Sequence, residues 1–230
     1  MDMKTCIPAR WHNWLRSMIK LTKGPKPEIL SANAAAWTAD LIHAIGLGDA
    51  HKKTANSIKS RYRHPDIKTA LLKETNGKCA YCESLLRHVT YGDIEHMTAK
   101  ASSPEATFEW DNLTVACDVC NTKKAENSVI DPYMSEPEER ILFFGPAAIP
   151  KAGDNEAELT LRRLDLNRPE LLGRRTEKIE NLQALRKIIS GAPSDLRIIL
   201  EKDFENELQD SREYASLSRS FHRFLDQGNH

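Results

Sequence analysis

Two closely spaced cysteine pairs limit what this chain can fold into. Cys79 and Cys82 form one CxxC motif, Cys117 and Cys120 form another, and 34 residues lie between the two motifs. Each CxxC turn brings two thiolates within reach of one ion, and two such turns complete a tetrahedral four-sulfur site. Zinc is the favoured metal, because it is redox-inert and accepts thiolate ligands readily. A site closed by four thiolates has no position for water, so we expect the zinc to be structural.

Polar residues suited to acid–base chemistry and to cation binding lie between and just after the cysteine pairs. Glu95 and His96 are adjacent, Asn112 follows a tryptophan by two positions, and Asn121 and Lys124 follow the last cysteine. Histidine has an unperturbed pKa near ~6.5, which suits proton transfer at cellular pH. Carboxylate and amide oxygens suit a hard cation such as Mg²⁺. An adjacent Glu-His pair is common by chance, and its position between two metal-binding turns makes this one a candidate site.

The combined pattern, C-x-x-C … E-H … N … C-x-x-C-N-x-x-K, resembles the HNH endonucleases, whose core is a ββα-metal finger. The resemblance implies that His96 is the general base and that Asn112 braces the loop opposite it. It also implies that Glu95 and Asn121 bind a divalent cation, Mg²⁺ or similar, at the scissile phosphate. Asn121 departs from the family pattern, because many members have a third histidine there. Its amide oxygen can still bind Mg²⁺, so we interpret the residue as a variant ligand.

Residues beyond the cysteine pairs resemble a narrower group, the HNH subunits of Septu-type anti-phage systems. The match covers roughly residues 75–190. Such subunits are encoded beside an ABC-like ATPase and sometimes accompany a retron, so the resemblance implies an ATPase partner and, in some systems, a retron reverse transcriptase with its DNA product. It also implies DNA, from an invading phage, as the substrate. The matching residues are Asp131-Pro132-Tyr133, Pro137, Leu142-Phe143-Phe144-Gly145, Thr160-Leu161, Leu166-Asn167-Arg168 and Arg174-Arg175.

Two other functions are consistent with the same residues. Such fingers grip backbone and groove shape and do not read bases, so an RNA- or tRNA-cleaving toxin is the first alternative. The second is a zinc-stabilised adaptor for the ATPase whose catalytic set is vestigial. A double CxxC motif by itself is most often a structural zinc module. His96, Asn112 and Asn121 at the family's positions favour the endonuclease over the adaptor.

The charge of the chain is distributed unevenly. The formal net charge is zero, yet residues 1–73 contain 13 Lys and Arg against 5 Asp and Glu. A nucleic-acid enzyme usually has a basic footprint, which would lie in this N-terminal part or on a partner. Such a cluster is often only a solvated helix face, and contact with an acidic surface on the ATPase is a further alternative. The candidate nucleic-acid contacts are Lys52, Lys53, Arg61 and Arg63, with Lys123 and Lys124 after the last cysteine.

Cysteine usage and hydropathy indicate a cytoplasmic protein. Four of the five cysteines belong to the CxxC pairs, and Cys6 is left over. Metal use and an unpaired thiol favour a reducing compartment over a disulfide scaffold. No apolar run approaches the ~20 residues that span a bilayer, and no signal peptide is visible. We therefore expect no membrane contact.

The expected fold class is α+β and mostly helical: a zinc-stabilised ββα-metal finger with helical segments on both sides. We predict an N-terminal helical basic region over residues 1–74, a nuclease core over 75–135 and a mainly helical region over 136–230. Helices are expected around 11–19, from a cap at Ser31 to about 46, from 65 to 75, from 118 and from 169 onward. Strands are expected at 86–94, 141–144 and 159–166, with loops over 98–109 and 145–154.

Overall fold

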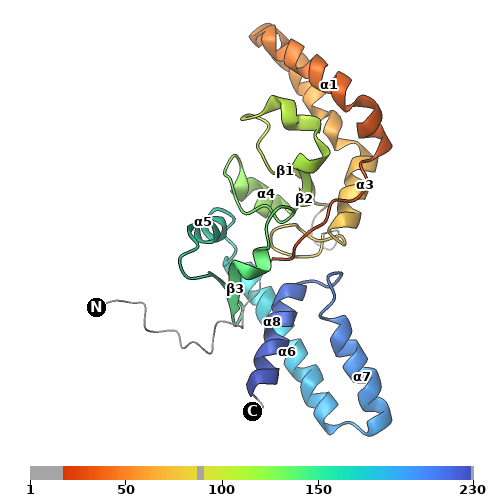
Figure 1. Cartoon of the computed structure of the whole chain (residues 1–230), viewed down its shortest axis with the longest axis vertical. Coiled ribbons are helices and arrows are strands. Elements are labelled where there is room, and N and C mark those ends of the chain that lie inside the picture. The colour runs from red at the N-terminus through yellow and green to blue at the C-terminus, as the bar shows by residue number, and fades with distance from the viewer. Residues whose placement is uncertain (1–17, 87–90, 229–230) are drawn as a thin grey trace, which may run out of the picture. The chain divides into compact units, whose positions relative to one another are not determined.

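The computed structural model describes residues 18–86 and 91–228, and its chain contacts divide into two compact units (Figure 1). One unit runs from Leu21 to Met134. The other joins residues 18–20 to the chain from Ser135 onward. The unit from Leu21 to Met134 contains residues 21–74 of the predicted N-terminal region and residues 75–134 of the predicted nuclease core. The division into three domains at 74 and 135 stays a prediction.

Helices dominate the described chain up to residue 75. They are α1 (Glu28–Gly46), the 3-10 turn η3 (Asp49–His51), α2 (Lys52–Lys59), the 3-10 turn η4 (Ser60–Arg63) and α3 (Pro65–Glu74). Helix α1 begins three residues before the predicted cap, because Pro27 stands at its N-cap and the Ser31 hydroxyl turns back to the Pro27 carbonyl. Helix α3 begins at a proline, as predicted, because the first helical position needs no N–H donor.

The predicted nuclease core contains a small two-stranded sheet followed by a helix. Strand β1 (Asp93–His96) pairs antiparallel with β2 (Leu113–Ala116), and His96 lies opposite Leu113 in the register. The 3-10 turns η5 (Pro104–Phe108) and η6 (Trp110–Asn112) connect the strands, and α4 (Asp118–Lys124) follows them. This is the expected ββα order, and α4 begins at the predicted residue. The predicted helix around 11–19 falls mainly outside the described residues, as does Cys6; Met18 and Ile19 are buried and not helical. Of the predicted strand 86–94, residues 87–90 fall outside the described residues, and of the others only Asp93 and Ile94 are in a strand.

A half-buried lysine, Lys23, joins the segment before α1 to the predicted nuclease core. The ammonium of Lys23 lies 4.2 Å from the ring centre of Trp110 and 4.4 Å from that of Tyr133. It also pairs with Glu74 at 3.2 Å and donates a hydrogen bond to the Leu113 carbonyl. Burial lowers the pKa of Lys23, against the opposing effect of the Glu74 charge. These contacts hold the segment before α1 against β2 and the end of α3. This segment is therefore part of the scaffold of the site.

The C-terminal unit contains a hairpin and four helices. Its elements are the 3-10 turn η7 (Pro137–Glu139), β3 (Ile141–Phe144), β4 (Ala147–Pro150), α5 (Asn155–Arg163), α6 (Pro169–Gly191), α7 (Ser194–Asn206) and α8 (Ala215–Gly228). The predictions for β3, α6, α7 and α8 are confirmed. Two predictions are wrong: residues 147–150 form a strand and not a loop, and most of 159–166 is helical. Together with the first unit, this confirms the mostly helical α+β class.

Residues that carry the narrower resemblance serve the packing of this unit. The side chain of Asn167 accepts a hydrogen bond from the Ala148 amide at 2.8 Å and donates one to the Ala148 carbonyl at 2.7 Å. Arg175 is buried, donates to the Leu166 carbonyl at 2.7 Å and lies over the Phe143 ring. Both side chains therefore join the β3–β4 hairpin to the segment between α5 and α6.

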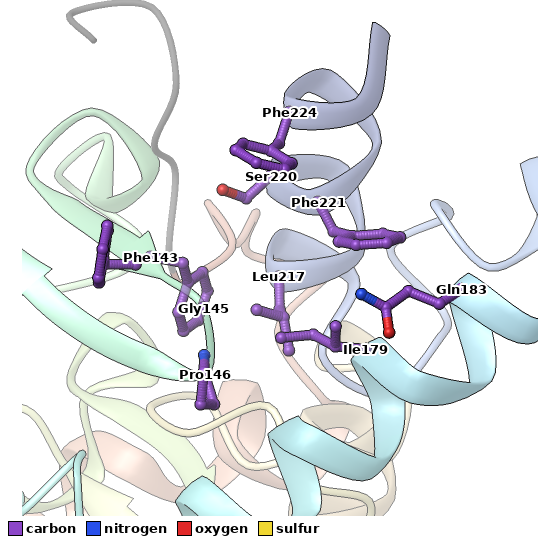
Figure 2. A pocket seen from close by; sticks show the side chains of 10 residues that line it. Phe143, Gly145, Pro146, Ile179, Gln183, Leu217, Ser220, Phe221 and Phe224 are labelled. Atoms are coloured by element: carbon purple, nitrogen blue, oxygen red, sulfur yellow. The ribbon is translucent and has the colours of Figure 1, made fainter. Parts of the chain in front are cut away.

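The same unit contains an apolar pocket of about 520 Å³. Figure 2 shows Ile179 of α6 and Leu217 of α8 on one side of it, with Phe143 and Pro146 of the hairpin on the other. None of the predicted site residues lines it. Within the described part of the chain, no helix combines the length and the apolar character needed to cross a membrane.

Candidate active site

The four cysteines of the two CxxC motifs meet at one point. All are buried, and their sulfur atoms lie within 4.8 Å of one another. Cys82 Sγ and Cys117 Sγ are 3.9 Å apart. Zinc–sulfur bonds of about 2.3 Å in a tetrahedron place sulfurs about 3.8 Å apart, so the cluster has the size of a zinc site. The Cys117 sulfur caps the first turn of α4 by accepting a hydrogen bond from the Cys120 amide.

The pKa values of the thiols in this cluster are shifted in opposite directions. Burial raises the pKa of the Cys79 thiol well above its ordinary value, and the hydrogen bond with Cys117 does the same for Cys120. Hydrogen bonds from the neighbouring thiols lower the pKa of Cys82. Four buried sulfurs at this spacing cannot all be thiolates without a cation to offset their charge. The donor set therefore fits a thiophilic divalent ion.

His96 ends strand β1 and is held by the loop over the site. Its side chain is 2% exposed, and its Nε2 lies 3.0 Å from the carbonyl oxygen of Thr107. A carbonyl oxygen can only accept, so Nε2 carries the proton and Nδ1 carries the lone pair. Residues 98–109, predicted as a loop, include the 3-10 turn η5, and Thr107 of this turn provides the orienting carbonyl.

The surroundings of His96 keep its imidazole neutral. Tyr62 of η4 lies edge-on against it, with ring centres 4.7 Å apart at 87°. The ammonium of Lys100 is 3.4 Å from Nδ1. Burial, and then the positive charge of Lys100, lower the pKa of His96 from 6.5 to about 3. The free nitrogen is thus able to accept a proton throughout the neutral range.

Asn112 joins the two ends of the loop that covers the site. Its Oδ1 accepts a hydrogen bond from the Thr98 amide at 2.7 Å, and its Nδ2 donates to the carbonyls of Thr98 and Ala106 at 3.1 and 2.9 Å. Trp110 and Leu113, close to Asn112 in the sequence, are both buried. The hydrogen bonds of Asn112 fit the bracing role that the resemblance implies, since they hold the segment that includes Thr107.

Glu95 and Lys124 form a buried pair below the site. The Lys124 ammonium lies 2.8 Å from Glu95 Oε1 and donates to the His96 carbonyl at 2.8 Å. Burial raises the pKa of Glu95, while the hydrogen bond and charge of Lys124 act in the opposite direction. Sequence analysis assigns Lys124 to nucleic-acid contact, but its side chain is 0% exposed. Lys124 is therefore an internal partner of Glu95, and its burial removes it from any surface that a substrate can touch.

Asn121 meets a residue that sequence analysis did not select. Its Nδ2 donates to Asp93 Oδ2 at 3.1 Å, and no contact joins Asn121 directly to Glu95 among the described hydrogen bonds. Asp93 begins β1, two positions before Glu95, and the period of two places both carboxylates on one face of the strand. That alternation was the signal available in the sequence. The structure thus places Asp93 and Glu95 on one face of β1 and brings Asn121 of α4 into contact with Asp93.

The predicted basic contacts lie in different environments. Lys52 and Lys53 on α2 and Lys123 on α4 are exposed. Arg61 pairs with Asp40 of α1 at 2.9 Å, so its charge is partly neutralised. Arg63 is exposed and donates to the Tyr62 hydroxyl at 3.4 Å.

Three residues close to His96 escaped selection. Sequence analysis did not select Tyr62, Lys100 or Thr107 as site residues. Thr107 acts through its backbone carbonyl, which leaves no trace in residue type. Lys100 follows His96 by four positions in an irregular loop, where no periodicity predicts which way a side chain points.

Comparison with known sequences identifies the class of this finger. The sequence profile of the family described as HNH endonuclease matches residues 79–127, the stretch from the first cysteine to just after α4. The chain therefore contains an HNH endonuclease domain, the domain of enzymes that hydrolyse phosphodiester bonds. Two curated relatives extend the likeness beyond that domain.

Both relatives are called Septu protein PtuB. The one from Bacillus mycoides (strain KBAB4) is 24% identical over 235 residues, covering 84% of this chain and 77% of the relative. The one from Bacillus thuringiensis is 33% identical over 114 residues, covering 47% of this chain and 44% of the relative. This chain is homologous to both, and the first alignment is longer than the HNH domain alone, as the narrower resemblance predicted.

Proposed function

We propose that this protein is a metal-dependent endonuclease of an anti-phage defence system, that its substrate is DNA, and that it acts with an ABC-like ATPase. The observation that carries the proposal is the neutral His96 whose Nε2 is committed to the Thr107 carbonyl, because it leaves Nδ1 free to accept a proton. The two relatives named Septu protein PtuB support the defence role. The four clustered cysteine thiols, which need reducing conditions, support a cytoplasmic location.

In the proposed reaction His96 is the general base. Its Nδ1 takes a proton from a water molecule as the water oxygen attacks phosphorus. A bond forms between that oxygen and phosphorus, the bond to the 3′ oxygen breaks, and the leaving oxygen is protonated from solvent. The Thr107 carbonyl accepts a hydrogen bond from Nε2–H throughout the reaction. This hydrogen bond also stabilises the imidazolium that forms.

The residues of β1 and α4 fit a divalent cation beside the base. Asp93 and Asn121 offer oxygen atoms at an accessible edge, and Glu95 adds a carboxylate already paired with Lys124. Oxygen donors of this kind suit Mg²⁺. A cation held there would offset the negative charge that develops on the phosphate. We propose Asn121 and Glu95 as ligands, with Asp93 as a further one. The four cysteines would hold zinc, whose role is to keep α4 against β1.

The proposal is tested by incubating the purified protein, with and without the co-expressed ATPase, with labelled duplex DNA, single-stranded DNA and tRNA in Mg²⁺. We expect duplex DNA to be cut, and His96→Ala to abolish cutting while zinc content and ATPase co-purification persist. Cutting of tRNA alone would instead establish the toxin. His96→Ala cutting as fast as the parent would refute the assigned base, and failure of the parent to cut any substrate would favour the adaptor.

A further inference from the structure

A lysine covers the free nitrogen of the catalytic histidine. The ammonium of Lys100 lies 3.4 Å from His96 Nδ1 and 3.0 Å from the Tyr62 hydroxyl, and 4.4 Å from the centre of the Tyr62 ring. An ammonium has three N–H donors and no acceptor, so it donates to the imidazole lone pair and to the phenol oxygen. Both groups that it meets are neutral.

The ammonium of Lys100 has no carboxylate in direct contact in the described part of the chain, and the charge of Glu95 acts on it only from a greater distance. Among residues 18–86 and 91–228, no carboxylate forms an ion pair with it, whereas Lys124, another cation near the base, is paired with Glu95 at 2.8 Å. A half-buried ammonium without a carboxylate partner, next to a base that must act on a phosphodiester, has the charge and the position to bind a phosphate oxygen.

We propose that Lys100 contacts a non-bridging oxygen of the scissile phosphate and that Tyr62 is the positioning residue that aims its ammonium. This rests on the proposed function, in which His96 Nδ1 is the base. A charged phosphate oxygen is a stronger acceptor than a neutral imidazole nitrogen. Substrate therefore draws the ammonium off Nδ1, and the space so vacated beside the lone pair admits the attacking water.

Tyr62 suits the positioning role because both its ring and its hydroxyl are held by neighbouring side chains. It is 5% exposed, its ring meets the His96 ring edge-on, and its hydroxyl accepts hydrogen bonds from Lys100 and from Arg63. Burial alone would raise the pKa of Tyr62, yet the hydrogen bonds from Lys100 and Arg63 lower it, as expected for an oxygen that serves as acceptor to two cations. The basic segment before the nuclease core thus contributes a residue to the active site.

The test compares four variants of the full chain. Lys100→Met keeps the length of the side chain and removes the charge, Lys100→Arg keeps the charge, and Tyr62→Phe keeps the ring against His96 and removes only the hydroxyl. The double variant of Tyr62→Phe and Lys100→Met shows whether the hydroxyl acts through the lysine. Lys73→Met, an exposed lysine on α3 of the same unit, is the matched control.

We expect Lys100→Met to lower kcat/KM by about tenfold to a hundredfold, the cost of losing a hydrogen bond to a charged group. Lys100→Arg should recover most of this loss. Tyr62→Phe should lower kcat/KM several-fold in the parent and have no further effect in Lys100→Met. Equal effects of Tyr62→Phe in the parent and in Lys100→Met would overturn the positioning role of Tyr62. A Lys100→Met variant as fast as the parent would overturn the role of Lys100 and leave that of His96 intact.

A binding measurement separates this inference from the proposed function. Affinity for a short labelled DNA duplex is measured against salt without divalent metal, where no cleavage occurs. Losing one phosphate contact should make the slope of log affinity against log salt shallower by about one unit in Lys100→Met and leave it unchanged in Lys73→Met. A merely structural Lys100 would lower the melting temperature without changing the slope, and an unchanged slope would refute the phosphate contact even if no substrate for cleavage were found.

Discussion

The ammonium of Lys124 is fully buried 2.8 Å from the carboxylate of Glu95, and the same group donates to the carbonyl of His96. One side chain of α4 thereby fixes two consecutive residues of β1. The helix that carries Asn121 and Cys120, with Cys117 at its N-cap, is thus fixed to the strand that carries His96. Burial of both charges makes this lock costly to break, because either partner alone would be left uncompensated.

Lys124→Met is therefore expected to destabilise the domain by about 3 kcal/mol or more, since the Glu95 carboxylate would remain buried without a partner. Urea unfolding of the zinc-loaded protein measures the change. Lys123→Met, on the exposed side of the same helix turn, is the control and should change stability by less than about 0.5 kcal/mol. Equal stability of the two variants would show that the pair contributes nothing to folding.

Sequence alone was sufficient for features set by spacing and residue type. The CxxC pairs, the start of α4 at Asp118 and the start of α6 at Pro169 all depend on local chemistry. The partner of Glu95 was not predictable, because it depends on how α4 rotates against β1. Lys124 looked like a phosphate contact for the same reason: its residue type is basic, and only packing shows that it points inward.

Helix α5 shows how a pattern can mislead. Leu159, Leu161, Leu164 and Leu166 suggested alternation, yet Leu159 is 45% exposed while Leu161 and Leu164, three positions apart, are buried. The Asp154 side chain caps the helix by accepting from the Ala157 amide at 2.9 Å. Acidic residues in its first turn and basic ones in its last were helix signals of greater value than the apolar spacing.

Zinc should be present at one ion per chain, bound by the four cysteines. Replacing Cys79 or Cys120 by alanine should release the metal and unfold the finger, since metal binding there supplies folding free energy. Elemental analysis with circular dichroism measures both. Mild EDTA should remove activity first, by taking the weakly held divalent cation, and added Mg²⁺ should restore it. A folded, active preparation without zinc would contradict the prediction.

The cleavage rate should fall less at acidic pH than it would if the base were a histidine with an ordinary pKa. The pKa of His96 is lowered to about 3, so its neutral form persists as pH falls through 6.5. We expect kcat/KM to be nearly constant from pH 7.5 to about 5.5, where an imidazole with a pKa near 6.5 would cost about tenfold. Stability should decline over the same interval, because the unfolded chain binds a proton near ~6.5 and the folded chain does not. Zinc content is followed in parallel, and a tenfold loss of rate at pH 5.5 with zinc retained would contradict the lowered pKa.

Asn121 and Asp93 should act together at the cation site. Asn121→Ala is expected to weaken the Mg²⁺ dependence of cleavage at least tenfold without loss of zinc, while Asn121→His should retain activity, because many members of the family have histidine there. Asp93→Asn separates two roles for the carboxylate: it keeps a polar partner for Asn121 and removes the charge. A Mg²⁺ titration of cleavage measures each variant, and an unaltered titration in Asn121→Ala would exclude Asn121 as a ligand.

The exposed charges of α2 are expected to contact nucleic-acid backbone. Lys52 and Lys53 are exposed, whereas Arg61 is paired with Asp40 at 2.9 Å and has less charge to offer a phosphate. Replacing both lysines by alanine should therefore weaken duplex binding on all sequences alike and make the salt slope shallower by up to about two units. Arg61→Ala should change the slope less. Cleavage at saturating substrate should change little, since the base and the proposed cation ligands are untouched.

Three accounts of this basic surface predict different results in the same double variant. If α2 follows the backbone of the substrate, the salt slope falls and the ATPase still co-purifies. If the lysines contact an acidic surface on the ATPase, the slope is unchanged and co-purification is lost. If they only solvate the helix, neither measurement changes. The uneven charge of the chain favours the first account. Residues 1–73 have a surplus of eight positive charges, whereas the nuclease core in residues 74–126 has 5 Lys and Arg against 9 Asp and Glu. An acidic core needs a basic neighbour to hold a polyanion against it.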